Sequence, residues 1–238
     1  MAIALEARIF ERATSSSSPR TYSKLLGIVF GALPAQIRGE WNQVFERFRP
    51  VRRIIDEAGF LEGAGVVKQF CGWASFWRGE RAQGTEEMSE AIAELRGLGS
   101  LIMSTWRLVL MAEAEIELES YDAARATVAD AFENLERTRE RWCEAEVYRV
   151  AGELERRRAD GDLGVAEQRY RKAIEIARNQ GAKWWELRAA KSLAQLLRDT
   201  NRGDEAREML AEIYSWFTEG FDTVDLKDAK ALLDELSN

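Results

Sequence analysis

The sequence contains no histidine among its 238 residues. Histidine is the usual general base near neutral pH and the commonest metal ligand in proteins. The other residues that bind metals, cysteine, aspartate and glutamate, show no metal-ligand spacing either. Ser15 to Ser18 form a serine run that lacks a neighbouring base. The sequence therefore gives little support to an enzyme, and we expect no catalytic residue, no metal and no cofactor.

Cysteines and long apolar runs are also scarce. Cys71 and Cys143 are far apart and form no CxxC pair, so we expect packed thiols in a reducing compartment and not a disulfide. No run reaches the roughly 18 apolar residues that a membrane-spanning helix needs. The apolar run 25–33 could mimic the core of a secretion signal, but it starts late and no small-residue cleavage site follows. These features favour a cytoplasmic protein that does not associate with a membrane.

Proline occurs only at positions 19, 34 and 50, so no later residue lacks a backbone donor for helix formation. Hydrophobic residues make up 46% of the chain and charged residues 32%, with many alanines, glutamates, leucines and arginines. This composition is typical of an all-α protein. The net charge of −7 speaks against general nucleic-acid binding, which needs a basic surface.

The stretch 142–180 contains the pattern that organises the rest of the chain. Two segments with apolar residues at three- and four-residue intervals flank a short turn at 159–162. The first segment has its apolar residues at Ala145, Tyr148, Ala151 and Leu154, and the second at Leu163, Ala166, Tyr170, Ala173, Ile174 and Ala177. We interpret the stretch as two antiparallel helices that pack along one side.

This pair of segments recurs with a period of about 40 residues, so the chain contains an internal repeat. Arg38-Gly39-Glu40 recurs 40 residues later as Arg78-Gly79-Glu80. Small residues keep the period in two series, which are Gly72, Ala112, Gly152 and Ala194, and Gly84, Ala124, Ala166 and Ala206. A large residue follows each member of the second series by four positions, at Met88, Val128, Tyr170 and Leu210. Because small side chains let two helix backbones approach closely, we expect these residues to line the seam of each helix pair.

The order of Gly152, Ala166, Tyr170 and Ala173 resembles the small, small, large and alanine positions of the tetratricopeptide repeat. The resemblance implies an all-α superhelix, a solenoid of four to five helix-turn-helix repeats with a C-terminal capping helix. Four repeats fit residues 59–222, and a degenerate repeat fits 20–58. The chain departs from the family in its longer period, in Gly84 at the seam and in the absence of proline at the repeat ends.

The two ends of the chain lie outside these repeats. We expect residues 1–19 to be a flexible segment and the following helix to end near Pro34. Residues 223–238 should hold the capping helix, at about 224–236, with Asp222 or Thr223 as its N-cap.

The C-terminal third has a narrower resemblance. The stretches 182–199 and 214–236 are similar to the helical-repeat tail of large bacterial signalling proteins that combine a class III adenylate cyclase or related module with a predicted ATPase. No phosphate-binding G-x-x-x-x-G-K-[ST] loop and no cyclase core are present. The resemblance therefore implies only the scaffold and a regulatory role in bacterial signalling.

In such a solenoid the first helix of each repeat lines the concave face, which implies a groove that binds a partner. The residues at the lining positions are aromatic at one end and basic at the other: Trp73, Phe76, Trp77 and Trp106, then Arg149, Arg156, Arg188, Lys191 and Arg198. Aromatic rings could hold apolar side chains, and the basic groups could hold a carboxylate or phosphate. We therefore expect a non-enzymatic scaffold that binds an extended protein or peptide with an acidic end.

Three alternatives remain at this point. Glu146, Glu153 and Asp199 could pair with the basic residues internally, so that no ligand is needed. The chain could instead be a structural module that forms homo-oligomers through aromatic residues of its first 60 positions, or a sensor of a small anionic metabolite.

Two further groups have a structural explanation. Trp142, Trp184 and Trp185 are best explained as core between repeats. The acidic run from Glu113 to Glu119 is typical of a solvated helix face.

Overall fold

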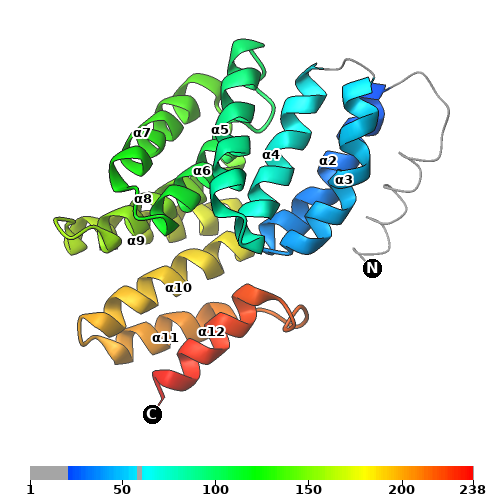
Figure 1. Ribbon diagram of the computed structural model, residues 1–238. Coiled ribbons are helices and arrows are strands. Elements are labelled where there is room, and N and C mark those ends of the chain that lie inside the picture. The colour runs from blue at the N-terminus through cyan, green and yellow to red at the C-terminus, as the bar shows by residue number, and fades with distance from the viewer. Residues whose placement is uncertain (1–20, 58–60, 238) are drawn as a thin grey trace. The chain divides into compact units, whose positions relative to one another are not determined.

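The computed structural model describes residues 21–57 and 61–237, and all regular structure in these ranges is helical (Figure 1). Eleven α-helices and one short 3-10 helix are present, and no strand occurs in the described ranges. The chain divides into two compact units, unit 1 up to Arg107 and unit 2 from Leu108. The all-α prediction is confirmed, whereas the predicted flexible segment 1–19 lies outside the described residues.

Unit 1 is built from α2 (Thr21–Ile37), α3 (Trp41–Glu57), α4 (Leu61–Arg78) and α5 (Arg81–Gly97). Helix α4 packs against both α3 and α5 and also contacts α2. Most of its residues between Gly63 and Phe76 are buried, as expected for a helix with apolar or small residues on every side.

The predicted end of the first helix near Pro34 is wrong, because α2 continues to Ile37. Pro34 lies in the last turn, where its missing N–H removes a single intrahelical hydrogen bond. The Arg38 N–H still donates to the Pro34 carbonyl at 3.0 Å, which completes that turn.

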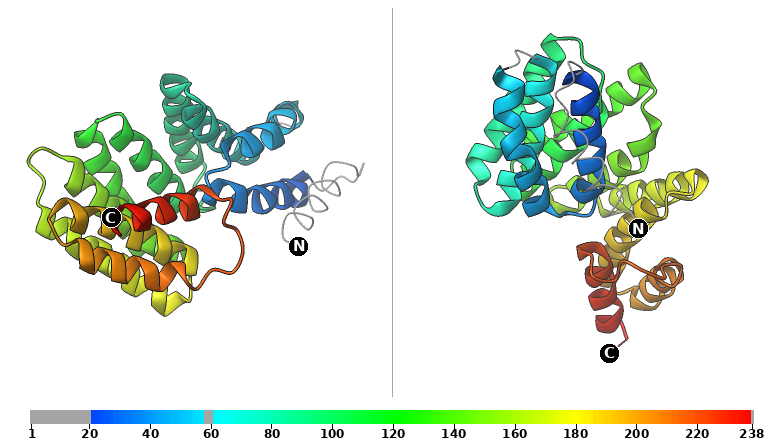
Figure 2. Two further views of the ribbon diagram at one scale, coloured as in Figure 1. Left: turned by 90° about the horizontal axis from the view of Figure 1, so that it is seen from below. Right: turned by 90° about the vertical axis from the view of Figure 1, so that its right-hand side faces the viewer.

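Unit 2 contains most of α6 (Ser104–Glu117), which begins before the division, followed by α7 (Tyr121–Thr138) and the 3-10 helix η1 (Arg141–Cys143). The remaining helices of unit 2 are α8 (Glu144–Arg157), α9 (Leu163–Gln180), α10 (Lys183–Asp199), α11 (Gly203–Tyr214) and α12 (Val224–Glu235). Each of α8 to α11 packs against the next, and α12 packs on α10 and α11 (Figure 2). One hydrophobic core joins α9 to α12.

The final helix matches its predicted position, but its predicted cap is wrong. Thr223 occupies the N-cap position without accepting a side-chain cap hydrogen bond. Its hydroxyl donates instead to the Gly220 carbonyl at 2.6 Å.

The small residues of both predicted series are buried, and the glycines among them lie where helices approach closely. A Cβ at Gly84 would lie 2.5 Å from the Phe76 nitrogen and 2.6 Å from the Gly72 carbonyl oxygen. A Cβ at Gly152 would lie 2.7 Å from the Tyr170 ring. The predicted seam is therefore confirmed for α4 with α5 and for α8 with α9, and the close contact of α4 with α5 explains why glycine stands at position 84.

The turns between paired helices repeat as well. Gly39, Gly79 and Glu119 stand 40 residues apart, and their φ angles are 72°, 107° and 58°. After each of them, the next N–H donates to a carbonyl five residues back, at 2.8, 3.0 and 2.9 Å. This left-handed helix end is the same in three successive pairs.

The fourth turn, between α8 and α9, differs because it holds two more residues: Gly152 and Ala166 are 14 residues apart, whereas Gly72 and Gly84 are 12 apart. Helix α8 ends at Arg157, its C-cap residue Arg158 is extended, and Asp162 caps α9. The Asp162 carboxylate accepts from the backbone N–H groups of Gly164 and Val165 at 2.7 and 3.1 Å. The insertion thus replaces the repeated turn by a side-chain cap.

Candidate functional site

The five basic residues proposed from the sequence lie on two neighbouring helices of unit 2. Arg149 and Arg156 are on α8, whereas Arg188, Lys191 and Arg198 are on α10, which contacts α8. We call these five residues the basic stripe. The seven-residue spacings within it correspond to two helical turns, which keeps the bases on one side of each helix.

Arg149 is the most buried member of the stripe, with 9% of its side chain exposed. Its Nε donates to Glu146 Oε1 and its Nη2 to Glu146 Oε2, both at 3.0 Å, and Nη2 also contacts Glu113. Burial alone would lower the pKa of Arg149, but the two carboxylates raise it well above its usual value. Arg149 is therefore a charged part of the interior and does not face a ligand.

Arg188 shares both of these carboxylates. Its Nη1 lies 2.9 Å from Glu146 Oε2, and its Nη2 donates to Glu113 Oε1 at 2.9 Å. The Glu146 side chain is fully buried. Two arginines and two glutamates thus neutralise each other, and removing one member would leave an uncompensated charge inside the fold.

Helix α12 supplies acids to the other bases of α10. The Lys191 ammonium donates to Asp225 at 2.9 Å and to Asp228 at 3.0 Å, and Arg198 donates to Glu235 at 3.0 Å. Burial alone would raise the pKa of Asp225, but the facing bases lower it below its usual value. The C-terminal helix is therefore held to α10 by ion pairs as well as by its apolar side.

Arg156 belongs to a second cluster, centred on Glu153. Arg156, Arg157 and the Tyr170 hydroxyl all donate to the Glu153 carboxylate, at 2.7, 2.6 and 2.8 Å. Burial alone would raise the pKa of Glu153, but the two arginines and Tyr170 hold it at about 2. Arg156 also lies 3.7 Å from Asp199.

Every base of the stripe therefore has a carboxylate partner. The predicted alternative of internal pairing, through Glu146, Glu153 and Asp199, describes the folded chain correctly. A ligand at the stripe would have to compete with these acids.

Most of the aromatic residues proposed for the groove are buried, so they do not offer the open surface that the sequence predicted. Trp73 and Phe76 are buried, with 4% and 1% exposure, because α4 is surrounded by other helices of unit 1, and Trp106 of α6 is buried as well, with 1% exposure. The Trp106 indole donates to the side chain of Gln36 on α2 at 2.9 Å. Trp77 is partly exposed and packs edge-on against Phe76. Helical spacing alone could not show that these positions are covered.

The other tryptophans agree only in part with the predicted core role. Trp185 is buried, and Trp184 is partly buried against Phe217, with ring centroids 5.9 Å apart. Trp142 is 37% exposed and lies 6.5 Å from the Trp185 ring.

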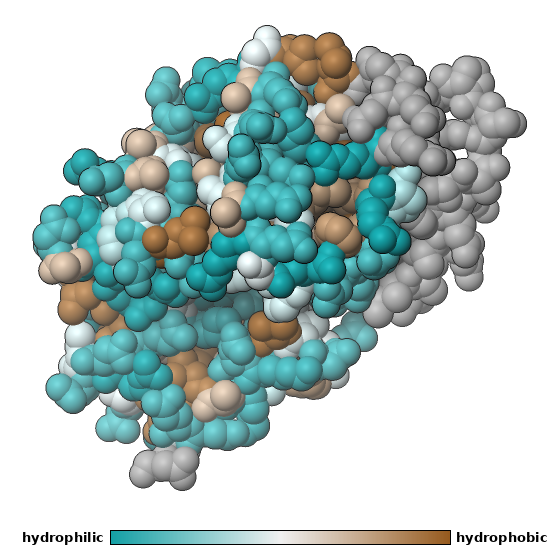
Figure 3. All heavy atoms as spheres, viewed as in Figure 1, coloured by the Kyte–Doolittle hydropathy of each residue, from teal (hydrophilic) through white to brown (hydrophobic). Residues whose placement is uncertain are grey.

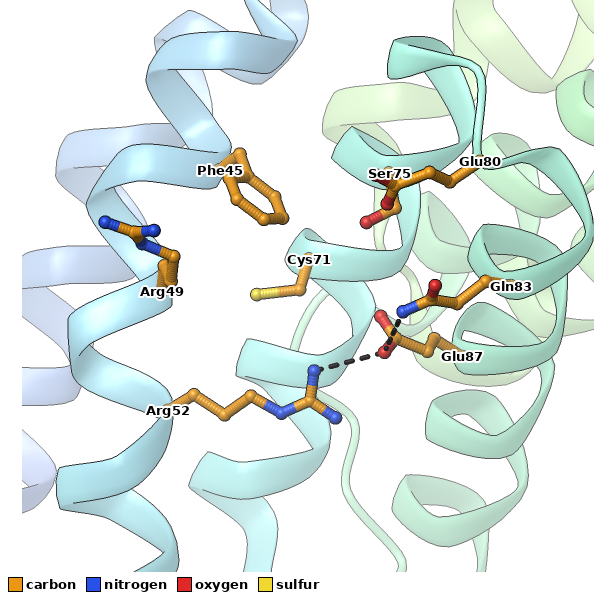
Figure 4. A pocket seen from close by; sticks show the side chains of 8 residues that line it. All are labelled: Phe45, Arg49, Arg52, Cys71, Ser75, Glu80, Gln83 and Glu87. Carbon is orange, nitrogen blue, oxygen red and sulfur yellow. Dashed lines mark hydrogen bonds and ion pairs between the residues drawn. The ribbon is translucent and has the colours of Figure 1, made fainter.

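A small pocket in unit 1 lies between α3, α4 and α5 (Figure 4). Cys71 points into it, next to an ion pair between Arg52 and Glu87 at 3.1 Å. Burial raises the pKa of the Cys71 thiol to about 12, so it stays protonated and is a poor nucleophile. The pocket volume is about 120 Å³, smaller than usual ligand sites. Cys143 is also buried, and neither cysteine forms a disulfide, as predicted.

Sequence reasoning missed the acids that complete the stripe. The predicted solvated face is wrong for Glu115, which is buried, and for Glu113, whose side chain is 17% exposed. Burial raises the pKa of Glu115. The acids of α12 that pair with Lys191 could have been predicted, because Asp225 and Asp228 stand three residues apart and therefore on the same side of the predicted final helix.

Comparisons with known proteins give no assignment: no family model matches the chain, and no curated protein matches it significantly. In the described ranges, no group of three or more cysteine or acidic side chains is arranged to hold a metal ion. None of the described helices is long and apolar enough to cross a membrane.

Proposed function

We propose that the chain is a non-enzymatic scaffold of the tetratricopeptide type that binds a protein partner, with a regulatory role in bacterial signalling. The observation that supports this proposal most is the regular pairing of helices. Gly39, Gly79 and Glu119 end the first helix of successive pairs in the same way, and small residues lie where α4 meets α5 and where α8 meets α9. Repeated helix pairs of this kind form extended surfaces that are used for binding.

The basic stripe is the surface we assign to an acidic end of the partner. Arg156 and Arg198 are its accessible members, with 21% and 35% of their side chains exposed, and both contact Asp199. Arg149 and Arg188 are less exposed, and both pair with Glu113, so we assign them a structural role. A partner carboxylate would replace Asp199 as the acceptor for two arginines.

Binding of acidic and neutral peptide pools, measured by fluorescence anisotropy, tests this assignment. Arg156→Glu combined with Arg198→Glu should abolish binding of the acidic pool, because both donors are lost and the charge is reversed. Arg125→Glu with Arg139→Glu is the matched control, since these arginines are 65% and 74% exposed and pair only along α7. Binding that survives in the first variant would remove the stripe from the proposal.

A further variant removes one of the acids that pair with the basic stripe within the chain. Asp228 is 53% exposed and binds Lys191, so Asp228→Asn should free part of that ammonium for a ligand. We expect tighter binding of the acidic pool, by about two- to fivefold, as for an exposed ion pair. Unchanged affinity would mean that α12 does not compete with the partner.

Self-association is the second candidate function. Among the described side chains of the first 60 residues, Phe30 is 58% exposed, whereas Phe48 is buried and Phe45 lies under the Arg78 guanidinium. One exposed aromatic anchor gives limited support to a homo-oligomer. Light scattering after size exclusion would decide, because a stable dimer that is lost in Phe30→Ala favours this function.

A further inference from the structure

The segment between α11 and α12 exposes several large apolar side chains. Trp216, Phe221 and Val224 are 57%, 46% and 44% exposed, and they fall within nine residues. Elsewhere the surface in Figure 3 is mostly hydrophilic with separate hydrophobic areas. Single exposed apolar residues are common, but a cluster of this kind usually marks an interaction site.

The rings of this segment pack in two groups. Tyr214 and Phe221 have ring centroids 5.8 Å apart, and Trp216 and Phe217 are edge-on at 5.2 Å. Phe217 in turn packs edge-on against Trp184 of α10, and both contact the core of unit 2. The exposed rings are therefore positioned before any partner arrives, which reduces the entropy lost on binding. We call Trp184, Tyr214, Trp216, Phe217, Phe221 and Val224 the aromatic face.

Acidic residues accompany the aromatic face and are not neutralised by bases of the same segment. Residues 208–226 contain five acids and no lysine or arginine, although Glu212 lies 3.8 Å from Arg178 and Asp225 pairs with Lys191. Glu219 and Asp222 stand on either side of Phe221 and are exposed. No ion pair or side-chain hydrogen bond of either residue is found within the described residues. This contrasts with the basic stripe, where each base is already paired.

We infer that the aromatic face docks a segment of a partner protein that carries lysine or arginine beside an apolar side chain. The apolar side chain would lie against Trp216 and Phe221, and the cation would lie over an aromatic ring or next to Glu219 and Asp222. A membrane with anionic headgroups fits poorly, because the acids would repel it. This surface selects a charge opposite to that selected by the basic stripe, so it goes beyond the proposed function.

Two peptide pools of equal length and equal apolar content test the inference, one with lysine and arginine and the other with aspartate and glutamate. The full-length chain should bind the basic pool, and added salt should weaken the binding. Trp216→Ala with Phe221→Ala should weaken it at least about 30-fold, as for central aromatic anchors. Leu163→Ala is the matched control, because Leu163 is 44% exposed at the start of α9. Circular dichroism shows whether each variant remains folded.

The charge requirement has its own pair of variants. Glu219→Lys with Asp222→Lys should reverse the preference toward the acidic pool. Glu86→Lys with Glu133→Lys changes the net charge equally at exposed positions of α5 and α7 and should keep the basic preference. Arg156→Glu with Arg198→Glu should also leave binding of the basic pool unchanged, which separates this inference from the proposed function.

Several outcomes would overturn the inference. Equal binding of the two pools would show that charge plays no part, and absence of binding by the basic pool would show that no such segment docks. A dimer that dissociates on Trp216→Ala would identify a second copy as the occupant. Binding to anionic vesicles that depends on Trp216 would identify a membrane instead.

Discussion

Gly84 lets α4 and α5 pack closely because glycine has no Cβ. The Cβ of any other residue would meet backbone atoms of α4, which cannot move aside as a flexible side chain can. At Gly152 a Cβ would meet the fully buried Tyr170 ring at 2.7 Å and the Ala166 carbonyl oxygen at 3.1 Å. The 40-residue spacing of small residues predicted the seam, but only the structure shows which of them must be glycine.

Gly84→Ala should lower the free energy of unfolding by roughly 1–3 kcal/mol, as expected for overpacking. Gly97→Ala is the control in the same helix, since nothing lies within 4 Å of its Cβ position. That change should stabilise by up to about 1 kcal/mol through helix propensity. Urea unfolding followed by circular dichroism measures both, and similar stability of the two variants would contradict the close approach of α4 and α5.

The internal ion pairs show a limit of sequence reasoning at the same scale. Arg149 and Arg188 both bind Glu113, which is 36 and 75 residues away along the chain. The neighbouring glutamates have the same local spacing, yet Glu115 on α6 is buried, whereas Glu119 in the turn after α6 is exposed. Which acid of the run is buried depends on distant helices, so periodicity could not predict it.

At the scale of whole elements, the helix ends follow simple local chemistry. The expected final helix, 224–236, lies at Val224–Glu235, and the turn at 159–162 separates α8 from α9 as predicted. The prediction for Pro34 failed because a proline in the last turn removes only one backbone hydrogen bond, which is not enough to end the helix early. The prediction for Thr223 failed because its hydroxyl has a competing acceptor in the preceding turn.

Glu119 holds a left-handed conformation that glycine holds at the matching positions 39 and 79. Such a conformation strains a residue with a Cβ by about 1 kcal/mol. Glu119→Gly should therefore raise the thermal midpoint, whereas Glu119→Ala, which removes the same carboxylate and keeps the strain, should not. If both variants melted alike, the repeated turn geometry would not be strained at Glu119.

At the scale of the molecule, the structure divides within α6, between Arg107 and Leu108. The predicted repeat boundary at 222 lies in a turn between α11 and α12, whereas the boundary at 58 lies outside the described residues, and no change of composition marks the division inside α6. The all-α class followed from composition and spacing. The burial of the aromatic residues of α4 did not, because it depends on the helices that surround α4.

The pH dependence of stability is set by carboxylates whose pKa differs between the folded and unfolded chain. The pKa of Glu153 is about 2 in the folded state, and the pKa of Asp225 is also lowered. Such groups stabilise the fold above their unfolded pKa, near 4. This stabilisation is lost as the pH falls through the folded pKa.

We therefore expect the thermal midpoint to fall between about pH 4.5 and pH 2. Glu153→Gln should flatten this fall and lower the midpoint at neutral pH, because a neutral amide leaves the charges of Arg156 and Arg157 without their carboxylate partner. Glu155→Gln is a control on the same helix, because the Glu155 side chain is 26% exposed and lies 3.8 Å from Arg158. Identical acid profiles for the wild type and Glu153→Gln would contradict the role of Glu153.

The shared turn at Gly39, Gly79 and Glu119 has a consequence for how the length of such a chain can change. Since the backbone leaves the helix in the same direction at each of these residues, joining residue 39 to residue 80, or residue 79 to residue 120, recreates a native junction. Gain or loss of a whole 40-residue period is therefore compatible with the local geometry. A shorter insertion fits only where a different cap takes over, as Asp162 does.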